Sequence, residues 1–217
     1  MSRRLFAEAL GSFLLFATVI GSGVMGESLS GGNVAVALLG NTGATGAMLF
    51  VLITMLGPIS GAHFNPAVTL VMRLRGEIAS GEALGFVAAQ VIAGVLGVWA
   101  AHLMFDLPIV QFSVKARTGS GQWAGEFIAT FGLILTILGT LRGRPAAVPA
   151  SVALYITAAY WFTSSTSFAN PAITLARSLS NTFAGIAPAD APGFIAAQLC
   201  GALAGLGCAR VLFGREA

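Results

Sequence analysis

Two copies of the triplet Asn-Pro-Ala are the residues of this sequence best suited to chemistry. They are Asn65-Pro66-Ala67 and Asn170-Pro171-Ala172, and each is followed by a β-branched residue, a Thr and a Leu. Asn is favoured as a helix N-cap and Pro at the first helical position, so each triplet predicts the start of a helix. An Asn amide can donate to a water or hydroxyl oxygen, while the positive end of a helix dipole repels cations. The pair therefore indicates a site for polar but uncharged solutes.

The composition places these triplets in a membrane. Of 217 residues, 56% are apolar and only 9% are charged, and the mean hydropathy is +0.87. A soluble domain carries about 25% charged residues, so lipid must cover most of this chain. A net charge of +3 is too small to indicate a nucleic-acid partner. Metal-ligand and nucleophile motifs are absent from the sequence, so we expect no metal, no cofactor and no enzyme activity.

Six segments are apolar and long enough to cross a bilayer, which takes about 20 residues. They cover approximately residues 5–26, 34–57, 83–105, 122–141, 146–165 and 192–213. Eight of the eleven Lys and Arg residues fall on the side that would hold both termini. Because cytoplasmic loops are enriched in basic residues, we expect both termini in the cytoplasm and a multi-pass protein of the inner (plasma) membrane.

Two further apolar segments, residues 58–75 and 163–180, are too short and too broken by Gly or Pro to span. About ten helical residues after each Pro would cover roughly 15 Å, half of the hydrocarbon core. Each segment is therefore predicted to be a re-entrant loop that enters extended and leaves as a half-helix. Irregular backbone at that depth is tolerated where it lines a water-filled cavity. We expect an all-α membrane protein of six transmembrane helices and two re-entrant half-helices.

The chain also repeats itself. Residues 85–91 match residues 193–199 at an offset of 108, and the two triplets lie 105 residues apart. We expect a single channel domain over residues 1–217, made of a first repeat half, 1–105, and a second repeat half, 122–217. Glu8 and Glu126 lie near the start of the first span of each half. Three spans per half predict that the halves are inverted in the membrane, an architecture typical of transport proteins. Inversion brings both half-helices head to head at the bilayer centre.

These residues make the sequence resemble the aquaporin (major intrinsic protein) family over nearly the whole chain. The resemblance is carried by residues 60–69, Ser-Gly-Ala-His-Phe-Asn-Pro-Ala-Val-Thr, by the second triplet and by the paired Glu and Gln residues. It implies an hourglass monomer with its own pore, usually assembled as a homotetramer. It also implies that Glu8 and Glu126 brace the re-entrant loops and that His63 lines the pore. A proton relay through the two Glu residues is the less favoured alternative.

The family builds a narrow outer constriction, the selectivity filter, from four positions. Here they hold Thr45, Ala158, Ser167 and Ile173. Water-specific members have an aromatic residue, a His, a small residue and an Arg, and glycerol-conducting members keep the Arg beside an aromatic wedge. The resemblance therefore implies a wide filter without a fixed cation, similar to a bacterial subgroup associated with arsenic resistance. Arg177, one helical turn beyond Ile173, could supply charge in the vestibule or cap loop carbonyls.

Such a filter predicts a passive channel for small neutral solutes. We expect water, glycerol and metalloid hydroxides, namely arsenite, antimonite and methylated arsenic. The alternatives are a water-selective aquaporin and an ion-coupled secondary transporter. A transporter should carry carboxylates around its substrate, and only Glu8 and Glu126 are available in the spans. Flux that saturates and depends on an ion gradient would identify the transporter.

Overall fold

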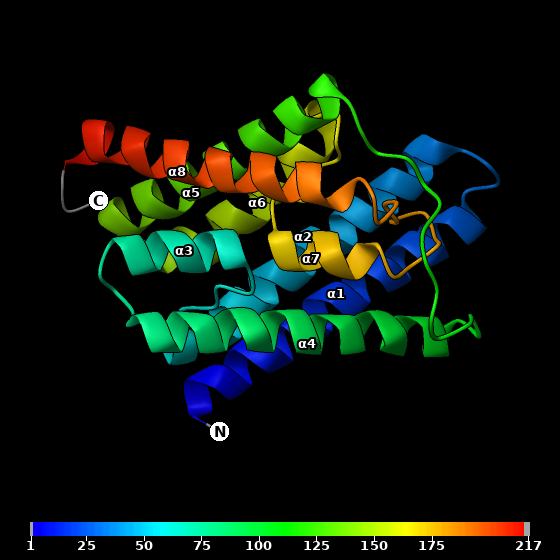
Figure 1. The fold of residues 1–217 in the computed structure, drawn as a ribbon, viewed down its shortest axis with the longest axis horizontal. Coiled ribbons are helices and arrows are strands. Elements are labelled where there is room, and N and C mark those ends of the chain that lie inside the picture. Colours follow the sequence, from blue (N-terminus) through cyan, green and yellow to red (C-terminus); the bar gives the residue numbers. More distant parts are fainter. Residues whose placement is uncertain (1, 215–217) are drawn as a thin grey trace.

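A computed structural model describes residues 2–214 and is helical throughout, with no β-strand in that range (Figure 1). Six long helices and two short ones make up the fold, with a single 3-10 turn, Pro145–Ala147, leading into α6. They are α1 (Arg3–Leu29), α2 (Val34–Ser60), α3 (Pro66–Leu74), α4 (Ser80–Met104), α5 (Ser120–Gly143), α6 (Val148–Phe162), α7 (Pro171–Arg177) and α8 (Ala191–Phe213). The six long elements, counting the turn with α6, are apolar and long enough to cross a membrane. The predicted fold class is confirmed.

The first re-entrant segment is shorter than the sequence suggested. Residues 58–60 form the last turn of α2, so Pro58 lies inside this helix. The helix ends instead at Gly61, whose φ of 93° is left-handed and whose N–H bonds the carbonyl of Gly57. Glycine adopts this conformation without steric cost, which makes it the natural helix terminator here. The second half-helix is also shorter than expected, because α7 ends at Arg177.

The two halves of the chain pack alike. Helix α1 lies against α4, and α5 lies against α8. Gly97 of α4 faces the backbone carbonyl of Phe13 in α1 so closely that a Cβ would not fit, and Gly201 of α8 faces Phe127 of α5 in the same way. Small residues that let helix backbones approach are typical of membrane helix pairs. The sequence repeat is therefore a repeat of helix packing.

The short helices lie end to end between the long ones (Figure 1). The N-terminal ends of α3 and α7 face each other, and the helices run outward in opposite directions. The start of α1 and the end of α8 lie at the same end of the molecule, which we call the inner end.

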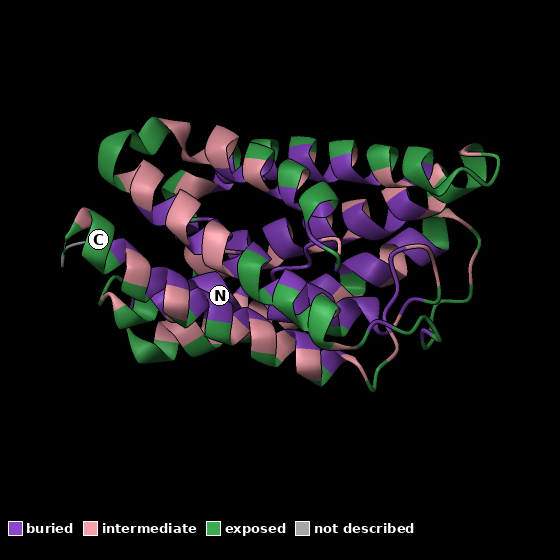
Figure 2. Cartoon of the chain, turned by 90° about the horizontal axis from the view of Figure 1, so that it is seen from above, coloured by how far each residue is buried: buried purple, intermediate pink, exposed green. Residues whose placement is uncertain are grey.

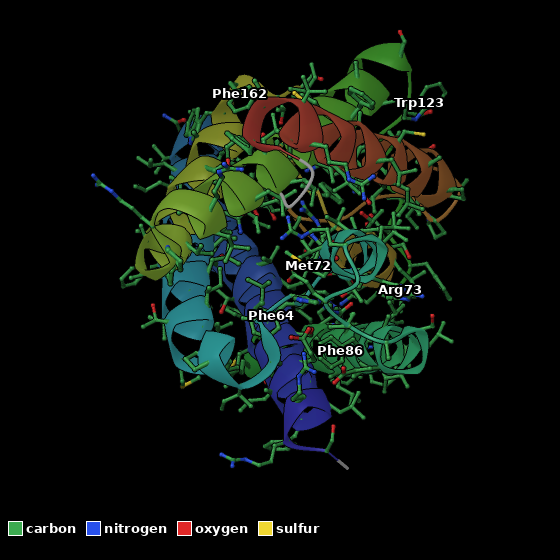
Figure 3. All side chains as sticks on the ribbon, turned by 90° about the vertical axis from the view of Figure 1, so that its left-hand side faces the viewer. Phe64, Met72, Arg73, Phe86, Trp123 and Phe162 are labelled. Carbon is green, nitrogen blue, oxygen red and sulfur yellow. The ribbon has the colours of Figure 1, made fainter. Side chains whose placement is uncertain are left out.

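Exposed residues gather on the outward faces of the helices and buried residues inside (Figure 2). Viewed along the long axis, Phe64 and Met72 lie near the middle, whereas Trp123 and Phe162 lie at the periphery (Figure 3).

Candidate pore

One cavity runs along the inside of the molecule between the re-entrant loops. Its wall extends from Leu141 and Val148 near the inner end to Thr45 and Arg177 at the opposite, outer end. Leu, Val and Ile side chains from α1, α2, α5 and α6 form a large part of this wall, and no acidic side chain of residues 2–214 takes part in it. Helices α4 and α8 do not reach the cavity, but each supplies a Gln that supports a loop.

Asn65 and Asn170 lie together in the middle of this cavity, as the inverted repeat predicted. The Asn65 Nδ2 donates to the carbonyl of Ala169 at 2.8 Å, and the Asn170 Nδ2 donates to the carbonyl of Phe64 at 2.8 Å. The two loops are thus joined by a reciprocal pair of hydrogen bonds. An amide NH2 has two N–H groups, so each Asn keeps one donor for a solute.

Each Asn is also the cap of its half-helix. Asn65 Oδ1 accepts from the N–H of Ala67 at 2.9 Å, and Asn170 Oδ1 accepts from that of Ala172 at 3.0 Å. The Pro of each triplet is the first helical residue, where its missing N–H costs nothing. Capping fixes the oxygen toward the helix, so the NH2 of each Asn is directed away from the helix and across to the other loop.

The backbone of the two loops repeats as closely as the sequence. Ala62 and Phe64 have φ values of 50° and 48°, and their counterparts Ser167 and Ala169 both have 49°. A non-glycine residue in this left-handed region costs about 1–3 kcal/mol and persists only where its surroundings hold it. The loops therefore need external support, and two buried carboxylates provide it.

Glu8 supports the first loop and is fully buried. Its carboxylate accepts from the N–H of His63 at 2.9 Å and of Phe64 at 2.8 Å. The Ser60 hydroxyl donates to it at 2.7 Å, and the Gln90 amide of α4 donates at 2.8 Å. Four donors on two oxygens leave this carboxylate committed to the loop rather than available to relay protons.

Glu126 does the same for the second loop. It is fully buried and accepts from the N–H of Phe168 and of Ala169, both at 2.8 Å. Gln198 of α8 donates to it at 2.6 Å and to Thr174 of α7 at 2.8 Å. These are the contacts that the family resemblance implied.

Two arginines that the sequence identified only as charges outside or at the ends of the spans also hold the loops. Arg117 Nη1 donates to the carbonyl of Ser165 at 3.2 Å, and its Nε donates to the carbonyl of Gly185 at 2.8 Å. In the first half, Arg4 Nη2 donates to the carbonyl of Ser60 at 3.4 Å. Ser60 and Ser165 are 105 residues apart, so the two carbonyls occupy matching positions of the repeat. Arg4 and Arg117 do not occupy matching positions, so the repeat could not identify them as the donors.

Lys115 and Arg117 lie in the segment 105–119, outside the six spans. This segment runs along residues 178–190, with the N–H of Ala187 bonded to the Lys115 carbonyl at 2.7 Å. Burial lowers the pKa of the Arg117 guanidinium, and the charge of Glu126 acts in the opposite direction. Lys115 is exposed, but partial desolvation of its amine, followed by the positive charges of Arg117 and Arg177, lowers its pKa to about 8.

Three of the four residues assigned to the selectivity filter line the cavity: Thr45, Ser167 and Ile173. Ala158 does not, because it is exposed on the outer face of α6. Tyr160 lines the cavity instead, and its hydroxyl donates to Thr45 Oγ1 at 3.4 Å. Successive residues of an α-helix are about 100° apart, so two residues turn a side chain to the opposite face. The position count that selected Ala158 was wrong by this half turn.

The outer end also differs from the expected filter without a cation. Arg177 lines the cavity and is only 2% exposed. Its Nε donates to the carbonyl of Ala184, and its Cζ lies 3.3 Å from the centroid of the Phe168 ring. Arg177 thus donates to a loop carbonyl and also lines the cavity. Tyr160 and Phe168 supply the aromatic groups that the filter count had missed.

His63 lines the cavity as the resemblance implied. Its Nδ1 lies 3.1 Å from the Thr69 hydroxyl, and its ring meets the Phe86 ring edge-on with 5.4 Å between centroids. The described residues contain no cluster of His, Cys, Asp or Glu side chains that could hold a metal ion. His63 is therefore a wall residue of the cavity.

Comparisons with known proteins agree with this geometry. The family model described as "Major intrinsic protein" matches residues 1–166. An aquaglyceroporin of Rhizobium meliloti is 55% identical over 212 residues, which cover 98% of this chain and 91% of that relative. Aquaporin Z of Photorhabdus laumondii is 28% identical over 173 residues, covering 71% of this chain and 73% of its own. The X-ray structure of the aquaglyceroporin from Plasmodium falciparum aligns with a TM-score of 0.72 over 97% of this chain and 96% of that one, at 17% identity, and so shares the fold. The chain belongs to the major intrinsic protein family, the aquaporins, and is a multi-pass membrane protein of this channel family.

Proposed function

We propose that this protein is a passive channel for water, glycerol and small neutral metalloid hydroxides, namely arsenite, antimonite and methylated arsenic. The observation that carries the proposal is the cavity that both loops line, with Asn65 and Asn170 at its middle. The likeness to an aquaglyceroporin at 55% identity supports glycerol as a solute.

The charges around the cavity favour neutral solutes. The N-terminal ends of α3 and α7 meet at the Asn pair, and each carries the positive end of a helix dipole. Arg177 adds a full positive charge at the outer end, and no acidic residue of the described chain lines the wall to offset it. A cation therefore meets repulsion at two levels, whereas a neutral solute meets none.

The wall is also suited to solutes that are polar on one side and apolar on the other. Leu49, Ile53 and Ile156 present hydrocarbon, while the two Asn amides present donors. A polyol or a metalloid hydroxide can place its hydroxyl groups on the donors and its remaining surface on the hydrocarbon. An inorganic cation has no such arrangement, because it needs oxygen ligands all round.

The proposal is tested by uptake into proteoliposomes followed by stopped flow, with protein-free liposomes as the control. We expect linear, low-activation-energy flux of water, glycerol and arsenite that no ion gradient alters. Fast water flux beside negligible glycerol and arsenite flux would identify a water-selective pore. Fast glycerol flux without arsenite flux would overturn the metalloid part alone, and saturable flux driven by an ion gradient would identify a transporter.

The filter assignment has its own test. Ile173→Arg places a second cation in the cavity wall beside Arg177 and should reduce glycerol and arsenite flux. Ile173→Leu has the same volume and is the matched control. If Ile173→Arg conducts glycerol and arsenite like Ile173→Leu, Ile173 is not part of the filter.

We further propose a homotetramer in the inner (plasma) membrane with both termini in the cytoplasm. Large apolar residues exposed on the outside of the helices, such as Leu84, Leu154 and Val211, support contact with lipid or with further copies. Native mass spectrometry would show the number of copies. A membrane-impermeant thiol reagent should label Thr118→Cys in intact cells, and Ala79→Cys only after permeabilisation. The reverse labelling pattern would invert the orientation.

A further inference from the structure

Arg177 is a buried cation without an ion pair. It is 2% exposed, and the salt bridges of residues 2–214 are Arg4–Glu82 and Arg75–Glu77. Its guanidinium is held by the carbonyl of Ala184 through Nε and by the ring of Phe168. The Tyr160 hydroxyl is a further hydrogen-bond partner of the Arg177 side chain. Within residues 2–214, however, no hydrogen bond uses the Arg177 Nη1.

Two polar atoms at this end of the cavity have no hydrogen-bond partner within residues 2–214. They are Arg177 Nη1 and the Oγ of Ser167, which is also 2% exposed. Both residues line the cavity. Nearly all buried polar atoms in proteins have a protein or water partner, so these two atoms of one wall are available to water or to a solute that passes there.

We propose that Arg177 and Ser167 form a subsite that binds one hydroxyl group of the permeating solute. Arginine only donates hydrogen bonds, whereas a serine hydroxyl both donates and accepts. A solute hydroxyl can therefore accept from Arg177 Nη1 while it donates to Ser167 Oγ. Ile173 and Phe168 line the same end and meet the C–H surface of the solute. The ligand class is a small neutral polyol, and the assignment deepens the proposed function.

The internal repeat shows what this end looks like without the subsite. At the repeat offset of 105 residues, Ser167 corresponds to Ala62 and Arg177 corresponds to Met72. Ala62 and Met72 line the inner part of the same cavity. Ala62 has a φ of 50° and Ser167 has 49°. Ala is thus compatible with this loop conformation, and Met is compatible with the matching position of a half-helix.

This correspondence defines the variants. Ser167→Ala and Arg177→Met replace each residue by its own repeat counterpart, so both remove the polar atoms with little change of shape. Ser164→Ala is the matched control, because Ser164 belongs to the same loop but is exposed and bonds the carbonyl of Gly121. Each variant is reconstituted in liposomes, and glycerol and water permeabilities are measured by stopped flow on the same vesicles.

The polyol should depend on the subsite more than water does. Water in a pore keeps neighbouring waters as partners, whereas a polyol fills the cross-section and relies on the wall for its hydrogen bonds. We expect Arg177→Met to lower glycerol permeability about tenfold and Ser167→Ala about threefold, because bonds to charged groups are the stronger ones. Water permeability should change less than about twofold, and Ser164→Ala should match the wild type.

The outcomes separate this inference from the proposed function. A wild-type protein that conducts water but no glycerol overturns the glycerol channel itself. A wild type that conducts glycerol, with Ser167→Ala equal to Ser164→Ala, overturns the subsite and leaves the channel intact. Because Ser167→Ala removes a single oxygen atom, this result stands even if Arg177→Met fails to fold. Equal loss of water and glycerol flux in both variants would also overturn the subsite, since it would indicate general damage to the pore.

Discussion

Replacing Glu126 by Gln should destabilise the protein strongly although the two side chains have the same shape. The carboxylate of Glu126 accepts three hydrogen bonds, from the N–H of Phe168, the N–H of Ala169 and the amide of Gln198. Glutamine offers one oxygen acceptor where the carboxylate offers two. At least one of the three buried donors must lose its partner.

The structure allows the loss to be sized. An unsatisfied buried donor costs about 1–3 kcal/mol, and a bond to a charged acceptor exceeds a neutral one by about 1 kcal/mol. One lost bond and two weakened bonds therefore sum to about 3–5 kcal/mol. For a chain of this length, 1 kcal/mol shifts Tm by about 2–4 °C, so Glu126→Gln should lower Tm by about 6–20 °C. The left-handed residues Ser167 and Ala169 add to the effect, because a loop that loses its anchor can relax.

The measurement is thermal unfolding in detergent, followed by intrinsic fluorescence, with water permeability of proteoliposomes as a second readout. Glu27→Gln is the control, because Glu27 is exposed on α1 and belongs to the same residue type. We expect Glu27→Gln to unfold within about 1 °C of the wild type, as surface changes usually do. If Glu126→Gln has the same Tm as Glu27→Gln and conducts water normally, the Glu126 carboxylate does not hold the loop, and the reasoning from its hydrogen bonds is wrong.

Three further predictions concern helix packing, the filter and the outer loop. Gly97→Ala should greatly reduce the yield of folded protein, because a Cβ there would meet the backbone of α1. A Cβ at Gly207 would meet nothing within 4 Å, so the control Gly207→Ala should express normally. Size-exclusion profiles after detergent extraction would show this difference in yield. Thr45→Phe should reduce glycerol flux in proteoliposomes and Ala158→Phe should not, because only Thr45 lines the cavity; equal effects would refute the corrected filter. Lys115 is the single lysine of the sequence, and its pKa lowered to about 8 predicts that acylation rises with pH around a midpoint near 8 in the folded protein. In the unfolded chain the midpoint should return to about 10.4, and a folded midpoint at that value would show that the loop and its two arginines do not lower the pKa of Lys115.

The parts of the fold that could be predicted are the lengths and the ends of the helices, because these depend on the local sequence. Span lengths follow from membrane thickness, and the starts of α3 and α7 follow from Asn caps and Pro at the first position. The meeting of Asn65 and Asn170 could be predicted from the repeat, because three spans per half require inversion. Each of these features is local or follows from counting, so no knowledge of side-chain packing was needed.

Features that depend on side-chain direction could not be predicted in this way. Ala158 was selected by counting along the chain, yet α6 presents Val152, Ile156 and Tyr160 to the cavity at four-residue spacing. A shift of two residues along a helix reverses the face, so a short change in the length of a neighbouring loop is enough to mislead the count. Arg117 was invisible for another reason, since its partners Ser165 and Gly185 are distant in sequence.

The chemistry of the pore is set by side chains that differ between two backbones of the same shape. Each loop has left-handed residues at matching positions, its own buried Glu and its own supporting Gln, so the two ends of the cavity are built on the same backbone arrangement. At matched positions, however, the inner end has Ala62, Val68 and Met72, and the outer end has Ser167, Ile173 and Arg177. Because the backbone is common to both, the loop conformation does not require this difference in polarity. According to the proposed subsite, a solute exchanges water for protein hydrogen bonds at the outer end. Selection among neutral solutes should therefore respond to substitutions there far more than to matched substitutions at the inner end.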